Sequence, residues 1–167
     1  MFKATSTKAL DLTICLNGIP IITAELKNPM TGQTVRDAVW QYQYDRDPND
    51  VIFQFKKRTL VHFAVDPDLV FMTTKLAGKS TFFLPFNRGD GMGAGNPPAP
   101  EGKYKTSYLW EQVWQRDSLL DLLARFIHLE VIEAEIGGKK VRKENMTQAA
   151  EANHHARAIQ QPGATRF

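Results

Sequence analysis

The dipeptide Asn17-Gly18 most constrains how this chain can fold, because it lies between two segments that have the pattern of β-strands. In the segment before it, 10–16, apolar and polar residues alternate, which is the period of a strand with one buried face. The segment after it, 19–27, is mainly apolar and ends at Asn28-Pro29. Because Asn-Gly between two such runs is a strong signal for a tight turn, the sequence predicts a β-hairpin here.

The predicted hairpin carries three residues that could bind a metal or act in catalysis, Asp11 on its first arm and Glu25 and Lys27 on its second. Residues two apart on a strand share a face, so Glu25 and Lys27 are expected to point the same way. Two carboxylates can hold Mg²⁺, and a nearby lysine can orient water or offset charge on a phosphate. On spacing alone, however, such a set more often belongs to a solvated strand edge.

The turn decides whether Asp11 joins the other two. A two-residue loop would set Asp11 opposite Ala24, which leaves Asp11 and Glu25 on opposite faces and forbids a shared metal. A three-residue loop, 17–19, with Gly18 at positive φ as a bulge, would set Asp11 directly opposite Glu25. Opposed like charges favour a cation between them, so we predict the second arrangement.

The rest of the chain predicts an α/β protein. Short β-branched and aromatic runs bounded by charged residues, Pro or Gly predict strands at 51–55, 59–65, 69–74 and 81–86. Apolar residues at helical spacing predict a helix at 34–44, a short helix near 110–114 and an amphipathic helix at 117–133. At 167 residues and 43% hydrophobic, the chain is long enough for one core. We expect one domain over 1–145, with a flexible Gly/Pro-rich loop at 88–103, and a flexible polar tail at 146–167.

Beyond these patterns, the chain closely resembles the N-terminal nuclease domain of the restriction (R) subunit of type I restriction enzymes, a member of the PD-(D/E)xK superfamily. The resemblance is carried by 11–20 and 25–29 in the hairpin, then by 41–48, 63–66, 71–74, 83–87, 93–98 and 108–129. It implies a mixed central β-sheet flanked by helices. It also implies that Asp11 and Glu25 hold Mg²⁺, that the backbone carbonyl of Leu26 adds a ligand, and that Lys27 serves the water and the phosphate.

Many relatives also carry a Gln followed four residues later by a Tyr on the next helix. Gln41 matches the first position, which implies a DNA contact, but Asp45 stands at the second, so we do not carry the role over to Asp45. The implied partners are double-stranded DNA and the specificity and methyltransferase subunits of a type I complex. ATP would act only in the motor of the full-length subunit, and Gly78-Lys79-Ser80 lacks the glycine and the helix that a P-loop requires.

Composition agrees with a cytoplasmic DNA-binding protein, although weakly. The net charge is +3 and the pI about 9.0, a mildly basic balance. Cys15 is the single cysteine, which excludes an internal disulfide, and no run approaches the roughly 18 apolar residues of a membrane span. R subunits are much longer than this chain, so we expect a fragment or the product of a disrupted reading frame.

Three functions remain open from the sequence. The first is a Mg²⁺-dependent endonuclease domain of a type I R subunit that hydrolyses phosphodiester bonds of unmodified foreign DNA. The second is a catalytically inactive module that binds DNA or partner subunits. The third is a stand-alone repair-type nuclease of the same superfamily.

Overall fold

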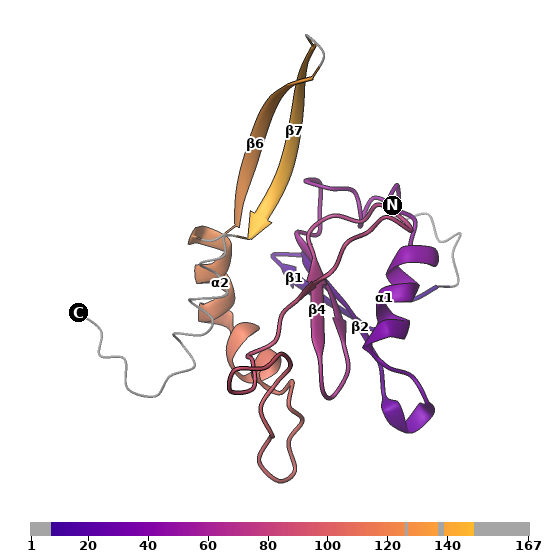
Figure 1. Cartoon of the computed structure of the whole chain (residues 1–167), viewed down its shortest axis with the longest axis vertical. Helices are drawn as coiled ribbons and strands as arrows, with labels where there is room; N and C mark the ends of the chain where they lie inside the picture. The colour runs from indigo at the N-terminus through magenta and orange to yellow at the C-terminus, as the bar shows by residue number, and fades with distance from the viewer. Residues whose placement is uncertain (1–7, 126, 137–138, 149–167) are drawn as a thin grey trace, which may run out of the picture. The chain divides into compact units, whose positions relative to one another are not determined.

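The computed structural model describes residues 8–125, 127–136 and 139–148, with side chains described over 8–125. The chain divides into two compact units, Met1–Thr106 and Ser107–Phe167 (Figure 1). Each unit is described below by itself.

The first unit is built on a five-stranded mixed sheet in the order β1-β2-β3-β4-β5. Its strands are β1 (Leu12–Leu16), β2 (Ile19–Leu26), β3 (Val61–Val65), β4 (Val70–Thr73) and β5 (Leu84–Pro85). Neighbouring strands are antiparallel except for β2 and β3, which are parallel. The connection between these two strands contains a 3-10 turn, η1 (Pro29–Thr31), and the helix α1 (Val35–Tyr44) (Figure 1). The expected α/β class with a mixed sheet is therefore confirmed.

Helix α1 begins where the sequence predicts it. The carboxylate of Asp37 accepts hydrogen bonds from the backbone N–H of Thr34 (2.7 Å) and from its hydroxyl (3.1 Å), which satisfies a donor that the helix start leaves unpaired. The apolar face of α1 then packs on the sheet, where Val35 and Ala38 contact Ala64 of β3. Burial of this face fixes the helix against the strands, so residues on its neighbouring face are presented at the end of β2.

The hairpin turn differs from the predicted one. Leu16 pairs with Ile19, so the loop has two residues, Asn17 (φ 50°) and Gly18 (φ 79°). Positive φ at both central residues is the signature of a type I′ turn, whose twist matches that of the flanking strands. The positive φ of Gly18 is confirmed, but the three-residue loop is wrong.

A β-bulge nevertheless gives the register that the longer loop was expected to give. The pairing shifts by one residue between Ile14 and Cys15, because β2 accommodates Ile21 as an extra residue. Leu12 consequently pairs with the residue before Glu25, and one further step in the same register sets Asp11 opposite Glu25.

Two predicted strands are corrected. Segment 51–55 forms consecutive turns, with the N–H of Phe53 and of Gln54 donated to the carbonyl of Asp50. Its apolar residues serve burial instead of strand pairing, since Phe53 packs with Tyr42 of α1 and with Leu76. Of segment 81–86, only Leu84–Pro85 forms a strand. The predicted strands at 59–65 and 69–74 are confirmed as β3 and β4.

The second unit begins with a helical turn, η2 (Leu109–Val113), and the helix α2 (Arg116–Arg125). An antiparallel hairpin of β6 (Ile127–Ile136) and β7 (Lys139–Gln148) follows. The short helix near 110–114 is confirmed, but the predicted helix 117–133 is wrong beyond Arg125. Segment 127–133 contains β-branched residues and also fits a two-residue period, so its pairing with β7 prevails over its helical spacing. Residues 146–148 of the predicted tail lie in β7, and 149–167 lie outside the described residues.

Candidate active site

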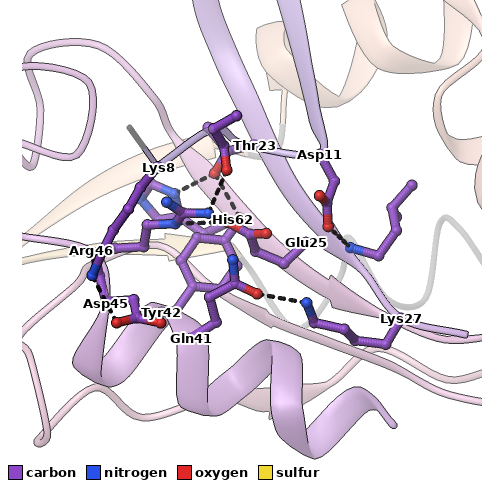
Figure 2. A network of polar contacts seen from close by, with 12 residues as sticks. Lys8, Asp11, Thr23, Glu25, Lys27, Gln41, Tyr42, Asp45, Arg46 and His62 are labelled. Atoms are coloured by element: carbon purple, nitrogen blue, oxygen red, sulfur yellow. Dashed lines mark hydrogen bonds and ion pairs between the residues drawn. The ribbon is translucent and has the colours of Figure 1, made fainter. Parts of the chain in front are cut away.

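Three elements meet at the end of β2 (Figure 2). Asp11 lies just before β1, Glu25 near the end of β2, and Gln41 on α1. The N–H of Leu26 is donated to Oδ2 of Asp11 at 2.8 Å, which ties the two arms of the hairpin together. Nζ of Lys27 donates to Oε1 of Gln41 at 2.6 Å, which links the end of β2 to α1. The structure thus brings together the residues that the sequence singled out.

Glu25 is fully buried, in contrast to the exposed Asp11. Burial raises the pKa of Glu25 from 4.5 to about 7, since a charged carboxylate is costly away from water. Arg46 opposes this shift, whereas the neighbouring Asp11 adds to it. The carboxyl of Glu25 is therefore poised between its protonated and ionised forms near neutral pH.

Arg46 is the principal residue that the sequence analysis missed. Its side chain is buried, and Nε and Nη2 both contact Oε1 of Glu25, at 2.7 Å and 2.5 Å. Nη2 also donates to the carbonyl of Ala9 at 2.6 Å, three residues before the first strand of the hairpin. Arg46 follows α1 in the charged run 45–47, which has the composition of a solvated turn. The usable signal was indirect, because a carboxylate in a buried strand requires a cation from elsewhere.

The second oxygen of Glu25, Oε2, is buried and has no hydrogen-bond partner within the described part of the chain. Such an orphaned oxygen is the atom that a cation would satisfy. The backbone carbonyl of Leu26 faces the side of Asp11, because the N–H and C=O of one strand residue point the same way and that N–H bonds Asp11. Two carboxylates and a carbonyl form a donor set of oxygens, which suits a hard divalent cation such as Mg²⁺.

The donor set is small. No cluster of three or more His, Cys, Asp or Glu residues suited to a metal ion occurs among the described residues. Mg²⁺ usually keeps several waters and binds through one or two carboxylates plus a phosphate, so a pair of carboxylates is sufficient for it. The residues present therefore fit the cation.

Three buried polar side chains form a hydrogen-bonded network next to the site. Oγ1 of Thr23 lies 2.9 Å from the hydroxyl of Tyr42 and 2.8 Å from Nδ1 of His62. Burial lowers the pKa of His62 to about 3 and raises the pKa of Tyr42 above its usual range. Both groups are thus uncharged near neutral pH, and they join β2, β3 and α1. The network fixes α1 on the sheet, so that Gln41, one residue before Tyr42, lies within hydrogen-bond distance of Lys27.

Asp45, four residues after Gln41, takes part in a different interaction. Its carboxylate pairs with Nζ of Lys8 at 2.7 Å, and both side chains are partly exposed. The structure thus gives this residue a surface ion pair, which agrees with leaving it out of the site.

The fold and the site define an α/β protein with a carboxylate pair and a lysine at the end of an internal strand, β2. Residues 1–81 match the family described as type I restriction enzyme R protein N terminus, and this segment contains Asp11, Glu25, Lys27, Gln41 and Arg46. This N-terminal segment, 81 of the 167 residues, is similar to that family. No curated protein and no solved structure matched the chain. None of the described helices is long and apolar enough to cross a membrane.

Proposed function

We propose that the first unit is the nuclease domain of a type I restriction enzyme R subunit and hydrolyses phosphodiester bonds of double-stranded DNA in the presence of Mg²⁺. The observation that carries this proposal is the buried, unsatisfied Oε2 of Glu25 beside Asp11, at a place where the register sets two carboxylates opposite each other. The family match over residues 1–81 supports it. The proposed partners are DNA and the specificity and methyltransferase subunits, and the PD-(D/E)xK fold is part of the proposal.

Asp11, Glu25 and the carbonyl of Leu26 would hold the Mg²⁺. When bound, the ion supplies charge neutralisation at the phosphate and an acidified water. Arg46 orients Glu25 by holding Oε1, which leaves Oε2 for the ion.

Lys27 is the proposed phosphate and water contact. Its ammonium group has three donors, and the bond to Gln41 uses one of them. The other donors can reach a phosphate oxygen or the attacking water, where a positive charge offsets the negative charge that develops during attack. Gln41 acts by fixing the lysine side chain, which otherwise has four rotatable carbons.

The test is cleavage of supercoiled plasmid by the purified 167-residue chain in Mg²⁺, with EDTA as the metal-free control. We expect at most weak nicking by this chain alone, which Asp11→Asn and Glu25→Gln abolish and which Lys27→Ala lowers by roughly 100-fold while the fold is kept. Asp45→Asn is the matched control, because it removes a nearby carboxylate outside the cluster. Equal nicking by Asp11→Asn and by the unchanged chain would refute the proposed site.

A binding module without catalysis is the second candidate, and one observation favours it. The guanidinium of Arg46 already neutralises Glu25, so the pair could be structural. Titration with Mn²⁺, followed by the electron paramagnetic resonance signal of the free ion, separates the two. Binding that Asp11→Asn and Glu25→Gln both weaken supports the nuclease, whereas unchanged binding supports the module.

A further inference from the structure

Two large aromatic side chains on α1 remain exposed, although the helix buries Val35, Ala38 and Tyr42. Trp40 is 52% exposed and Tyr44 is 50% exposed. Their rings stack, with centroids 5.0 Å apart and an interplanar angle of 14°. The four-residue spacing places both on one side of the helix, so the chain presents a pair of nearly parallel rings to solvent.

Positive charge borders both ends of this ring pair. Nζ of Lys79 lies 5.4 Å from the centroid of the Tyr44 ring, in cation–π range. The turn that carries Lys79 is held beside the helix, since Nε2 of Gln43 donates to the carbonyl of Thr81 at 3.0 Å. At the other end, the exposed Arg36 lies four residues before Trp40 on the same helix. We name these four residues the aromatic stripe: Arg36, Trp40, Tyr44 and Lys79.

The aromatic stripe lies next to the candidate active site. Gln41 adjoins Trp40 in sequence and lies three residues before Tyr44, so Gln41 and Tyr44 are neighbours on the helix surface. The same Gln41 side chain bonds Lys27 at 2.6 Å. A nucleic acid strand whose phosphate contacts Lys27 would therefore pass one helical turn from the exposed rings.

We propose that the aromatic stripe binds unpaired DNA bases by stacking, so that the substrate of this domain includes a single-stranded segment beside the bond that is cleaved. Exposed aromatic faces flanked by cations are the arrangement that binds single strands, because every base has a flat face and every nucleotide carries a phosphate. Bases in a duplex are already stacked on one another and offer no such face. The inference rests on the proposed function for placing DNA at Lys27, but its test requires no cleavage.

The experiment measures binding of a short fluorescein-labelled oligothymidine to the full chain in EDTA by fluorescence anisotropy, with a duplex of equal length as comparison. We expect tighter binding of the single strand and quenching of tryptophan fluorescence. Trp40→Leu and Tyr44→Leu keep apolar area and helix propensity but remove the flat rings, and each should weaken single-strand binding by about tenfold. Trp40→Phe should keep most of the affinity, since a ring remains.

Tyr104→Leu is the matched control, because Tyr104 is a 64% exposed aromatic residue of the first unit that is not part of α1. Single-strand affinity unchanged in the Trp40→Leu and Tyr44→Leu variants overturns the proposal, and so does equal weakening of duplex binding. Affinity kept in these variants but lost in Lys79→Ala would mean charge alone, and would also overturn it. The binding assay contains no metal, so a chain that does not cleave DNA can still show base stacking. If instead the chain cleaves DNA but does not prefer single strands, this inference is refuted and the proposed nuclease function is not.

Discussion

Asp45 and Arg46 are consecutive residues at the end of α1, and both pair with a charged partner, yet their pairs lie in opposite environments. Asp45 and Lys8 leave 35% and 51% of their side chains exposed, whereas Arg46 and Glu25 leave 4% and 0% (Figure 2). Water competes for the first pair and screens it, so it contributes little. The second pair is removed from water, so each charge depends on the other for its stability. These two adjacent residues therefore contribute very differently to the free energy of unfolding.

The largest expected effect comes from breaking the buried pair. Arg46→Met should lower the free energy of unfolding by about 3–5 kcal/mol, because it leaves Glu25 buried without its cation. Urea denaturation monitored by circular dichroism measures this loss. If Glu25 also holds Mg²⁺, the added ion should restore more stability to this variant than to the unchanged chain. A loss below about 1 kcal/mol would contradict the buried character of the pair.

The pH dependence of stability isolates the charge on Glu25. Its pKa is raised from 4.5 to about 7 on folding, so it contributes stability that falls as pH rises across that window, by about 3 kcal/mol in total. The pKa of His62 is lowered from 6.5 to about 3, so its contribution rises with pH over about 3 to 6.5. Between about pH 4.5 and 6.5 the two slopes oppose each other, and the unchanged, metal-free chain should be nearly flat.

Glu25→Gln should remove one of the two slopes. Stability should then rise with pH between about 4.5 and 6.5, by up to about 1.4 kcal/mol per pH unit. Denaturant midpoints at a series of pH values in EDTA measure the slope, with His62→Gln as the opposite control, for which stability should fall. A flat profile in Glu25→Gln would mean that the carboxyl of Glu25 does not titrate in this window.

A smaller effect is expected at Thr23, which tests the buried network that Thr23 forms with Tyr42 and His62. Thr23→Val keeps the shape of the side chain but removes the hydroxyl that contacts Tyr42 and His62. Leaving these two groups with one fewer partner should cost about 1–3 kcal/mol in the free energy of unfolding. Thr13→Val, at an exposed position of β1, is the control and should be close to neutral.

The smallest effect is expected at the exposed pair. Asp45→Asn should change the free energy of unfolding by less than about 1 kcal/mol, since it removes a solvated ion pair. Binding of Mn²⁺ should stay unchanged in the same variant. A loss comparable to that of Arg46→Met would erase the contrast between the two pairs.

Local signals in the sequence predicted much of the fold. The Asn17-Gly18 turn, helix α1 and strands β3 and β4 follow from turn chemistry, capping and short periodicities. The failures occurred where composition admitted two structures. Segment 51–55 has the composition of a strand but forms turns in which Phe53 is buried. Segment 127–133 fits both a helical and a two-residue period, so only its pairing with β7 makes it a strand.

For the candidate site, the sequence by itself determined which residues were candidates: Asp11, Glu25, Lys27 and Gln41 stand in a recognisable order on the chain. Only the tertiary structure decided how they meet. The bulge at Ile21 sets the register at Asp11, and Arg46 reaches Glu25 across 21 positions. Turns and helix caps depend on the sterics and hydrogen bonds of residues that are close in sequence. Burial of a charge depends on which distant group supplies the opposite charge, and that choice exists only once the sheet and α1 have packed together.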